Sequence, residues 1–500
     1  MARTALFLPL VLALLAGCKD PPRSPAARKR PTPAAAPGPT ILDPRFAFTC
    51  SAERVGCDGV FPVRPPDGER PSEAAVLQGG EEALRLRMKT LQRAKRSIRI
   101  QALIFRGDEA GQLIARHLKK KRAEGVEVRV IVDALSNLDW QTQWLYFDLK
   151  KHGVEVEGYE ALYLQWITAE QRPDDPLRPN KRFHEKLWIV DAEDPGSAIA
   201  IVGGLNIANE YFRLGTLPSE RWHDQDVALR GRIVDDVTRA FDRNYAFFKG
   251  LKARLPALFN PDNAWRIARR HRALIRKVRT PNWGRKSADD RLAVVFSKPC
   301  APVFSRVRAR LVQSRPRVGE TYIEQAYADL VARAKRRIVI VNAYFIPSRA
   351  FTEKLRQAAA RGVRVVVLTN SPESNDIHSV ALVSRHTYAN LLASPGIEIH
   401  EWQGRPFNEG TLHAKFAVFD SEVAIVGSFN LDPRSARLNS ESAVVLQDAK
   451  LAGELERQVL ERDLPRARRI SLAEARTFRA PKEVAAQFKL LFSLPLRDWL

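Results

Sequence analysis

The sequence predicts an α/β fold in two tandem halves related by a pseudo-twofold axis, each with a mixed, largely parallel sheet. Three observations predict this fold. The 500 residues are 45% hydrophobic, which is enough for a large buried core. Apolar strands alternate with helical patterns along most of the chain. One series of sequence features occurs twice, a whole domain apart.

Each half begins with a helical pattern, which is followed by a short run of basic residues and then by an apolar strand. This block covers residues 93–100 in the first half and 333–340 in the second. A second helix follows and ends at Gly125 or Gly362, before another β-branched strand. Such alternation is typical of buried strands linked by helices. Two unrelated α/β units would share some of this pattern. Both halves, however, have a helix, a strand with a basic start, a second helix that ends in glycine, a second strand and then a histidine-containing phrase, and this common order argues for a duplication.

The domain organisation follows from these blocks. They predict a first half over residues 76–250 and a second half over residues 296–465. The segment between them, residues 251–295, is basic with interspersed aromatic side chains. It is expected either as a solvated connecting helix or as a segment that rests on anionic headgroups. A helical tail is expected over residues 466–500.

The N-terminal segment predicts export and a lipid anchor. Arg3 precedes an apolar run over residues 5–15, which is too short to span a bilayer and suits the core of a signal peptide. The run ends in a Leu-Ala-Gly-Cys tetrapeptide that resembles a bacterial lipobox, in which the cysteine is lipidated. We therefore predict a signal peptide over residues 1–17 and lipidation of Cys18. The alternative is an ordinary signal peptide, or a short membrane anchor, with an incidental cysteine.

Residues 18–75 are expected to form a tether after the lipidated cysteine. Their first part is rich in proline and alanine, a composition that cannot build a core. Cys50 and Cys57 could close a small disulfide loop in an oxidising compartment, which would leave Cys300 unpaired. The expected location is the cell envelope, as a membrane-anchored lipoprotein that faces the periplasm or the exterior. No Cys-His spacing resembles a zinc site, so neither a metal nor a cofactor is expected.

The chain is strongly basic. Lysine and arginine number 81 against 57 acidic residues, which gives a formal net charge of +24. This balance favours an anionic partner, namely a lipid surface, a phosphorylated substrate or nucleic acid. A solvated basic surface without a specific patch explains the charge equally well.

A short phrase occurs once in each half and carries candidate chemistry. The two copies are His184, Lys186 and Asp191, then His413, Lys415 and Asp420. The apolar residues after each histidine argue for a strand, in which the histidine and the lysine of a copy share one face. Neither copy would be a complete catalyst. Together they supply a nucleophile, an acid for a leaving alcohol and paired cations for phosphoryl oxygens.

A glycine turn and an asparagine follow each copy, at the end of the next strand. The residues are Gly204 and Asn206 in the first copy, and Ser428 and Asn430 in the second. Such a turn lets the backbone approach a phosphate closely. The asparagines stand at expected helix starts, where binding an anion and capping the helix are compatible roles. Further along, Asp224 and Glu441 are predicted to orient the imidazoles.

These motifs resemble the phospholipase D superfamily, whose signature is His-x-Lys-x-x-x-x-Asp followed by a glycine turn with an asparagine. The likeness covers residues 76–465, and residues 342–347, 368–371, 427–435 and 438–441 look like the bacterial cardiolipin synthase branch. The resemblance implies two α-β-α sandwich halves with the active site at their interface. It also implies a metal-independent transfer in two steps, in which one histidine attacks phosphorus and the other carries the proton.

The resemblance also implies roles for the residues. It favours His184 as nucleophile and His413 as acid and base, while Lys186, Lys415, Asn206 and Asn430 would bind phosphoryl oxygens. Asp191 and Asp420 belong to the signature, but their place at a strand end favours a turn or ion-pair role. The implied partners are anionic glycerophospholipids and a membrane surface, reached through the lipid anchor. Nucleic acid is not expected as a partner, and the chain is expected to be a monomer.

The first copy departs from the second in two ways. Gly204 stands where the second copy has Ser428, which removes one hydroxyl donor. Related synthases share the Gly-Gly form, so this change does not indicate inactivation. The stretch from His184 to Asn206 is longer than that from His413 to Asn430, and a longer hairpin after Asp191 explains the difference.

The predicted function is a phosphatidyltransferase that makes cardiolipin from phosphatidylglycerol and a second phospholipid. With water as acceptor, the same enzyme would release phosphatidic acid. A nuclease or other phosphodiesterase uses the same chemistry, but small nucleases of this superfamily carry a single phrase and dimerise. A surface lipoprotein that only binds phospholipid is the remaining alternative, and the presence of all eight signature side chains argues against it.

Overall fold

The computed structural model describes residues 70–133, 135–137, 139–158, 182–215, 217–253, 292–316, 320–404 and 410–479. The predicted signal peptide, Cys18, Cys50, Cys57 and most of the tether lie outside the described residues. So do most of the basic connecting segment and the chain after residue 479. No helix within the described ranges has the length and apolar character needed to cross a membrane.

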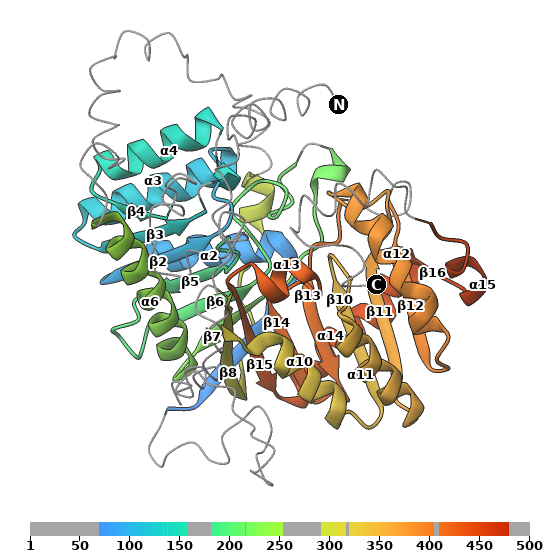
Figure 1. Cartoon of the computed structure of the whole chain (residues 1–500). Helices are drawn as coiled ribbons and strands as arrows, with labels where there is room; N and C mark the ends of the chain where they lie inside the picture. Colours follow the sequence, from blue (N-terminus) through green and yellow to red (C-terminus); the bar gives the residue numbers. More distant parts are fainter. Residues whose placement is uncertain are drawn as a thin grey trace, which may run out of the picture. The chain divides into compact units, whose positions relative to one another are not determined.

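The first half is a seven-stranded sheet with helices on both faces (Figure 1). Its strands are β1 (Ser72–Val76), β2 (Ser97–Ala102), β3 (Glu127–Val132), β4 (Glu155–Glu157), β5 (Leu187–Val190), β6 (Ile199–Gly203) and β7 (Asp226–Arg230). They lie in the order β1-β7-β6-β5-β2-β3-β4. Its helices are α2 (Gly79–Arg93), α3 (Glu109–Ala123), α4 (Trp140–Lys151) and α6 (Ile233–Ala253). Short 3-10 turns cover Leu135–Asn137 and Pro218–Glu220.

The second half repeats this order of strands. They are β8 (Ser305–Arg315), β10 (Arg337–Asn342), β11 (Arg364–Asn370), β12 (Ile397–Trp402), β13 (Lys415–Phe419), β14 (Val423–Gly427) and β15 (Glu441–Gln447), in the order β8-β15-β14-β13-β10-β11-β12. The helices are α10 (Tyr322–Arg333), α11 (Arg349–Ala360), α12 (His378–Leu392), the short α13 (Pro433–Arg437) and α14 (Ala449–Arg457). A π-helical stretch, η6, follows α14 over Gln458–Asp463, and η7 covers Leu464–Arg466. A two-residue strand, β9 (Glu320–Thr321), pairs with β8.

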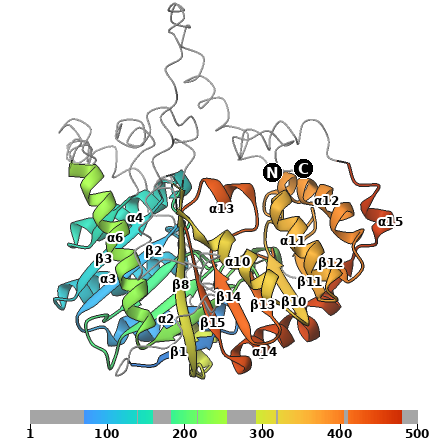
Figure 2. The same ribbon diagram turned by 60° about the horizontal axis from the view of Figure 1, so that its bottom comes forward.

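The first strands of the two halves join the sheets edge to edge. Strand β1 pairs with β8 in antiparallel register, with Ser72 opposite Val307 and Ala74 opposite Ser305. Figure 2 shows β8 in the middle of the sheet, between β15 and β1. A single hydrophobic cluster then runs under α6 of the first half and α14 of the second. The predicted pair of tandem halves is confirmed, and their sheets are continuous.

Among the described strands, parallel pairing links β2-β3-β4 and β10-β11-β12, and three isolated parallel bridges lie outside the named strands. The other described pairs are antiparallel, so the sheets are less parallel than the sequence predicts. The reason is that helices cover both faces of the sheet. Strands buried on both faces become uniformly apolar, whichever way they run.

Equivalent helices of the two halves begin and end with the same local devices. Asp108 caps α3 by accepting the Gly111 N–H (3.1 Å), and Ser348 caps α11 by accepting the Phe351 N–H (3.2 Å). The glycines that follow these helices have φ near +90°, a region that side chains with a Cβ rarely adopt. Gly125 and Gly362, which recur at the same place in the two halves, therefore mark the ends of these helices.

Three domain boundaries differ from the predicted ones. The predicted start of the first half, residue 76, is the last residue of β1, so the sheet begins within the predicted tether. Val295, expected in the connecting segment, packs in the core of the first half. After residue 465 the chain forms strand β16 (Ala467–Arg469), which pairs with β12, before the four-residue helix α15 (Leu472–Ala475). The described part of the expected helical tail therefore extends the second sheet.

Candidate active site

The two histidines lie just before strands, where each half pairs with the other. Strands β5 and β13 begin at Leu187 and Lys415, a little later than the pattern predicts. The His184 N–H donates to the carbonyl of Ser440 (2.9 Å), and the His413 N–H donates to that of His223 (2.6 Å). Each bond crosses from one half to the other. The main chain itself therefore brings the two phrases together.

A carboxylate from the opposite half holds each imidazole. Nδ1 of His184 lies 2.8 Å from Oε2 of Glu441, and Nδ1 of His413 lies 2.6 Å from Oδ2 of Asp224. Both carboxylates are completely buried. Because Nδ1 is engaged in each ring, Nε2 is the nitrogen that remains for chemistry.

Burial changes the proton affinity of both rings. It lowers the pKa of His184 to about 4, although the Glu441 carboxylate acts in the opposite direction. Burial, with the neighbouring Lys415, also lowers the pKa of His413 well below its ordinary value. Two aromatic rings pack against His413, namely Tyr211 at 5.1 Å and Trp222 at 5.2 Å between ring centres. A bound phosphodiester anion is expected to raise both pKa values again.

The two lysines are buried beside their histidines. Nζ of Lys186 donates to the carbonyl of His184, and Nζ of Lys415 donates to that of His413. Burial lowers the pKa of Lys186 to about 7 and that of Lys415 to about 8. Burial removes the water that would otherwise solvate these two ammonium groups, so a bound anion would stabilise their charge.

The asparagines of the turns line the same pocket with unpaired amide atoms. Oδ1 of Asn206 accepts the N–H of Ile104 (3.1 Å), and its Nδ2 has no acceptor among the described residues. The side chain of Asn430 likewise leaves one amide atom, Oδ1, without a donor in the described ranges. Buried polar atoms normally have partners, so the Asn206 amide hydrogens are available to an anion, whereas Oδ1 of Asn430 is available to a donor group of a ligand.

The two orienting carboxylates differ in their own surroundings. Burial raises the pKa of Glu441, but His184, Lys186 and the Ser428 hydroxyl act more strongly together and lower it overall. Burial raises the pKa of Asp224 to about 6, against the effect of Lys415. Gly204 borders Asp224 so closely that a Cβ there would lie 2.1 Å from Oδ1 of the aspartate. The glycine of the first turn therefore makes room for this carboxylate.

The signature aspartates lie away from the histidines, at the opposite ends of β5 and β13. Asp191 accepts the backbone N–H groups of Lys95, Arg96 and Ser97, with the shortest distance 2.7 Å. Asp420 accepts those of Lys335, Arg336 and Arg337 in the same manner. Both residues have positive φ. They hold a turn at the start of β2 and β10, in agreement with a turn role and not with contact to substrate.

The pocket at the histidines has a volume of about 630 Å³. Both histidines and both asparagines line it, together with residues from each half. The sequence analysis assigned no chemistry to the following members: Arg182, Tyr211, Trp222, Tyr344, Asp376 and Arg434. Arg434 stands in the stretch that indicated the cardiolipin synthase branch, which was the only signal for it. Tyr344 likewise stands in the branch-like stretch 342–347, and the remaining four lie outside these stretches.

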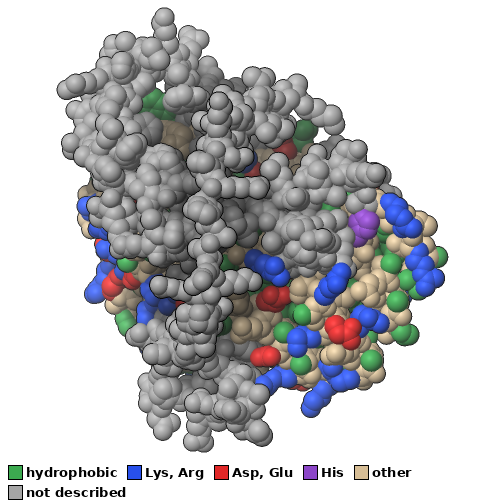
Figure 3. Space-filling view, viewed as in Figure 1, with side chains coloured by type: hydrophobic (Ala, Val, Ile, Leu, Met, Phe, Trp, Pro, Cys, Tyr) green, Lys and Arg blue, Asp and Glu red, His purple; other side chains and the backbone are tan. Residues whose placement is uncertain are grey.

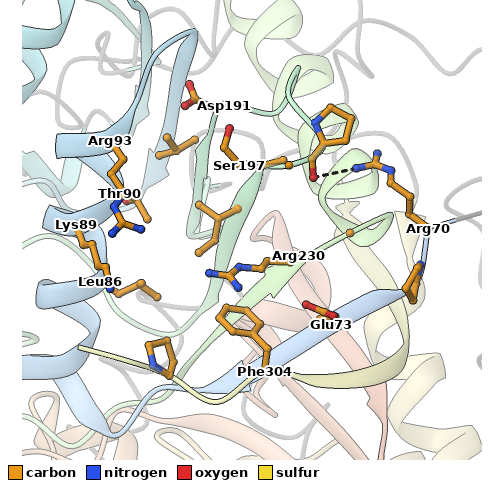
Figure 4. A pocket seen from close by; sticks show the side chains of 18 of the residues that line it. Arg70, Glu73, Leu86, Lys89, Thr90, Arg93, Asp191, Ser197, Arg230 and Phe304 are labelled. Carbon is orange, nitrogen blue, oxygen red and sulfur yellow. Dashed lines mark hydrogen bonds between the residues drawn. The ribbon is translucent and has the colours of Figure 1, made fainter. Parts of the chain in front are cut away.

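A second cavity, of about 590 Å³, lies at the other ends of the first-half strands. Figure 4 shows Arg93, Lys89 and Arg230 around it, with Phe304 beside Arg230. The longer hairpin after Asp191 forms one wall. On the described part of the face in Figure 3, basic side chains are interspersed with acidic ones. This second cavity is separate from the histidine pocket.

A model of the family described as "cardiolipin synthase, PLD-like domain" matches residues 88–243 and 327–463, which contain both phrases. The chain belongs to this family. Cardiolipin synthase C of Escherichia coli is 25% identical over 430 residues, covering 80% of this chain and 87% of that protein. The major cardiolipin synthase of Bacillus subtilis is 28% identical over 384 residues, covering 76% and 66%.

The family assignment agrees with the architecture of a solved relative. A phosphatidylserine synthase of Haemophilus influenzae is similar in structure, with a TM-score of 0.59 and 15% identity, over 84% of this chain and 93% of that chain. At this identity the likeness concerns the fold. It agrees with the expected α/β architecture, and the two stretches matched by the family model, one in each half, show two phospholipase D-like halves.

Proposed function

We propose that this protein is a phosphatidyltransferase that exchanges the alcohol of a phospholipid phosphodiester, as a cardiolipin synthase does. The observation that carries the proposal is the pair of histidines, one from each half, each held at Nδ1 by a carboxylate of the other half. Two imidazoles at one pocket, with a buried lysine beside each, suit a nucleophile, an acid and an oxyanion site around one phosphorus. The family match and the named relatives support a phospholipid as substrate.

The proposed reaction has two steps through a phosphohistidine. In the first, Nε2 of His184 bonds to phosphorus while the bond from phosphorus to the leaving alcohol oxygen breaks. Protonated His413 gives its proton to that oxygen. In the second, His413 takes the proton of the acceptor alcohol, whose oxygen bonds to phosphorus and displaces His184. Bonds and protons balance without a further co-reactant.

The non-bridging oxygens would lie among Lys186, Lys415 and the two turn asparagines. Charge accumulates on these oxygens in the transition state, and the low dielectric of the pocket strengthens their contact with buried ammonium groups. The same contacts would help to keep both lysines protonated in the complex. Asn206 would add its amide hydrogens, for which the described residues provide no acceptor.

Lipid turnover tests the proposal. Purified protein is incubated with phosphatidylglycerol vesicles, alone and with phosphatidylethanolamine, and cardiolipin is expected as product. His413→Ala removes the proton carrier and should lower the rate by about a hundredfold or more. His117→Ala, on α3 and outside the pocket, is the matched control and should retain the rate. No cardiolipin with either lipid composition would reject the proposal, and phosphatidic acid as main product would indicate hydrolysis.

A second candidate activity is cleavage of nucleic acid, which the net charge of +24 favours. The same two histidines would then act on a nucleic-acid phosphodiester. DNA cleavage that disappears in His413→Ala would support this candidate. Intact DNA after incubation with an active preparation would reject it.

We also propose that Cys18 carries a lipid and that the protein works at a membrane of the cell envelope. The lipobox-like tetrapeptide supports the anchor. Because one chain supplies both histidines, a monomer is sufficient for activity. Incorporation of labelled fatty acid, and its loss in Cys18→Ser with release of the protein from membranes, tests the anchor. An unlabelled wild-type protein in the soluble fraction would contradict it.

A further inference from the structure

The carboxylate that holds His184 receives several side-chain donors. The Ser428 hydroxyl donates to Oε2 of Glu441, beside the contact with Nδ1 of His184. At Oε1, Glu441 accepts the Ser435 hydroxyl (2.8 Å) and the Asn439 amide (3.2 Å). All three donors are buried. Hydrogen bonds to an ionised carboxylate favour its charged form, so this arrangement stabilises Glu441 as an anion.

Asp224, which holds His413, has a poorer set of donors. In the described part of the chain it accepts the backbone N–H of Gln225 at Oδ1 (2.8 Å), in addition to its contact with the imidazole. A serine in place of Gly204 would match Ser428, but its Cβ would clash with the aspartate. Gly204 therefore leaves the space that Asp224 occupies, whereas in the second copy the Ser428 hydroxyl donates to Glu441. The two histidines thus face carboxylates of different character.

The lysines add a second difference between the rings. Each lysine donates to the main-chain carbonyl of its own histidine, but Nζ of Lys415 also lies 2.7 Å from Nδ1 of His413. An ammonium group next to a ring nitrogen disfavours positive charge on that ring. Protonated His413 is therefore the better proton donor, and the His184 ring is better able to keep a positive charge.

A phosphohistidine needs surroundings that stabilise a positively charged ring. An imidazole bonded to phosphorus at Nε2 and protonated at Nδ1 carries a positive charge, which an ionised carboxylate at Nδ1 stabilises. We propose that Ser435 and Asn439 are positioning residues, which together with Ser428 hold Glu441 ionised and thereby place the phosphohistidine on His184. This inference rests on the proposed function. It names two residues outside the duplicated phrase and gives the serine of the second turn a role in the covalent step.

The helix α13 delivers one of these residues. Its N-cap, Asp432, accepts the backbone N–H of Ser435 (2.7 Å), which fixes the main chain that carries the serine side chain and its hydroxyl. The same hydroxyl oxygen accepts the N–H of Asn430 (3.2 Å), so the turn asparagine and Glu441 share one support. The titratable and charged groups that act on Glu441 come from both halves: His184, Glu185, Lys186, Lys415, Asp432 and Arg434.

The pH dependence of intermediate formation tests the proposal. The full chain is mixed with phospholipid labelled in its phosphate, and the rate of protein labelling is measured by rapid quenching between acidic and neutral pH. Loss of a donor makes the His184–Glu441 pair take up a proton more easily. In Ser435→Ala the acidic limb of the rate should therefore move to higher pH by about one unit. Asn439→Ala, which acts on the same oxygen from another segment, should move the limb in the same direction.

Ser384→Ala is the matched control. This buried hydroxyl donates to the carbonyl of Phe345 and touches neither imidazole nor carboxylate. Its acidic limb should stay at the wild-type position. The proposal would be overturned if the acidic limb of the rate kept its wild-type position in both Ser435→Ala and Asn439→Ala. It would also be overturned if the limb moved equally in Ser384→Ala. Absence of label from active wild-type protein would instead overturn the phosphohistidine mechanism on which it rests.

Discussion

The two lysines of the site are buried together with the histidines, and this burial sets their charge near neutral pH. Burial lowers the pKa of Lys186 to about 7 and that of Lys415 to about 8, from 10.5 for an exposed lysine. Only the protonated ammonium binds a phosphoryl oxygen well. We therefore expect kcat/KM to fall as the pH rises through 7 to 8 in the free enzyme.

The alkaline limb of the pH profile checks this expectation. Initial rates at low lipid concentration, measured from pH 5 to 10, give kcat/KM directly. A decrease centred near pH 7–8 agrees with buried lysines whose affinity for protons is reduced. A rate that stays constant up to about pH 10 would show that both ammonium groups keep their ordinary pKa.

Gly204 is predicted to be indispensable because of Asp224. In Gly204→Ser the new Cβ would lie 2.1 Å from Oδ1 of the aspartate, which must then move away from His413. We expect a loss of stability of about 1–3 kcal/mol and a loss of activity of at least tenfold. Urea unfolding and lipid turnover measure the two effects.

The control is the same substitution in open space. A Cβ at Gly250, on α6, meets no atom within 4 Å. Gly250→Ser should therefore leave both stability and turnover close to wild type. A Gly204→Ser protein as stable and active as this control would show that Asp224 is not confined by the turn.

The sequence predicts the residues of the site well and their partners less well. The duplicated phrase identifies both histidines, both lysines and both asparagines, because phosphoryl chemistry restricts the side chains it can use. The carboxylates Asp224 and Glu441 also follow from position. That each serves the histidine of the other half depends on how the halves pack, and no local pattern records this. Ser435 and Asn439 stand in the motif that indicated the branch, but their contact with Glu441 arises only from folding.

At the scale of elements, the signature aspartates are predicted to stabilise the fold. Asp191→Ala or Asp420→Ala leaves three backbone N–H groups without their acceptor. Asp191 is buried, whereas Asp420 is half-buried, so water can replace part of the loss at the second site. We expect Asp191→Ala to cost about 2–4 kcal/mol and Asp420→Ala to cost less.

Denaturant unfolding and active-site titration separate stability from catalysis in these variants. Turnover per folded molecule should remain near the wild-type value in both, because neither aspartate reaches the pocket. If turnover per folded molecule fell a hundredfold while stability was unchanged, the aspartates would act in catalysis and the turn role would be wrong.

Sequence patterns predict the positions of the strands better than their directions. The strand expected between each histidine phrase and its glycine turn is present, as β6 in the first half and β14 in the second. Their direction was harder to predict, since an apolar run is the same whether it lies parallel or antiparallel to its neighbour. The start of β1 is not predicted because the strand has only five residues, too few for a clear period.

At the scale of the molecule, the two halves are predicted to unfold together. Strand β1 pairs with β8, and one hydrophobic cluster contains residues such as Leu229 of the first half and Leu446 of the second. A shared core makes partial unfolding expensive for either half. Calorimetry of the purified protein should therefore show a single transition. Two resolved transitions would mean that the halves are separate folding units.

The central claim is that two phrases form one asymmetric site, in which His184 becomes covalently bonded to phosphorus and His413 moves the proton. Trapping the intermediate tests it most directly. Protein is incubated with phospholipid labelled in its phosphate, quenched under alkaline conditions that preserve phosphohistidine, and digested to locate the label. We predict label on the peptide with His184 in wild type and in His413→Ala, and none in His184→Ala. Label on His413, or its persistence in His184→Ala, would contradict this account.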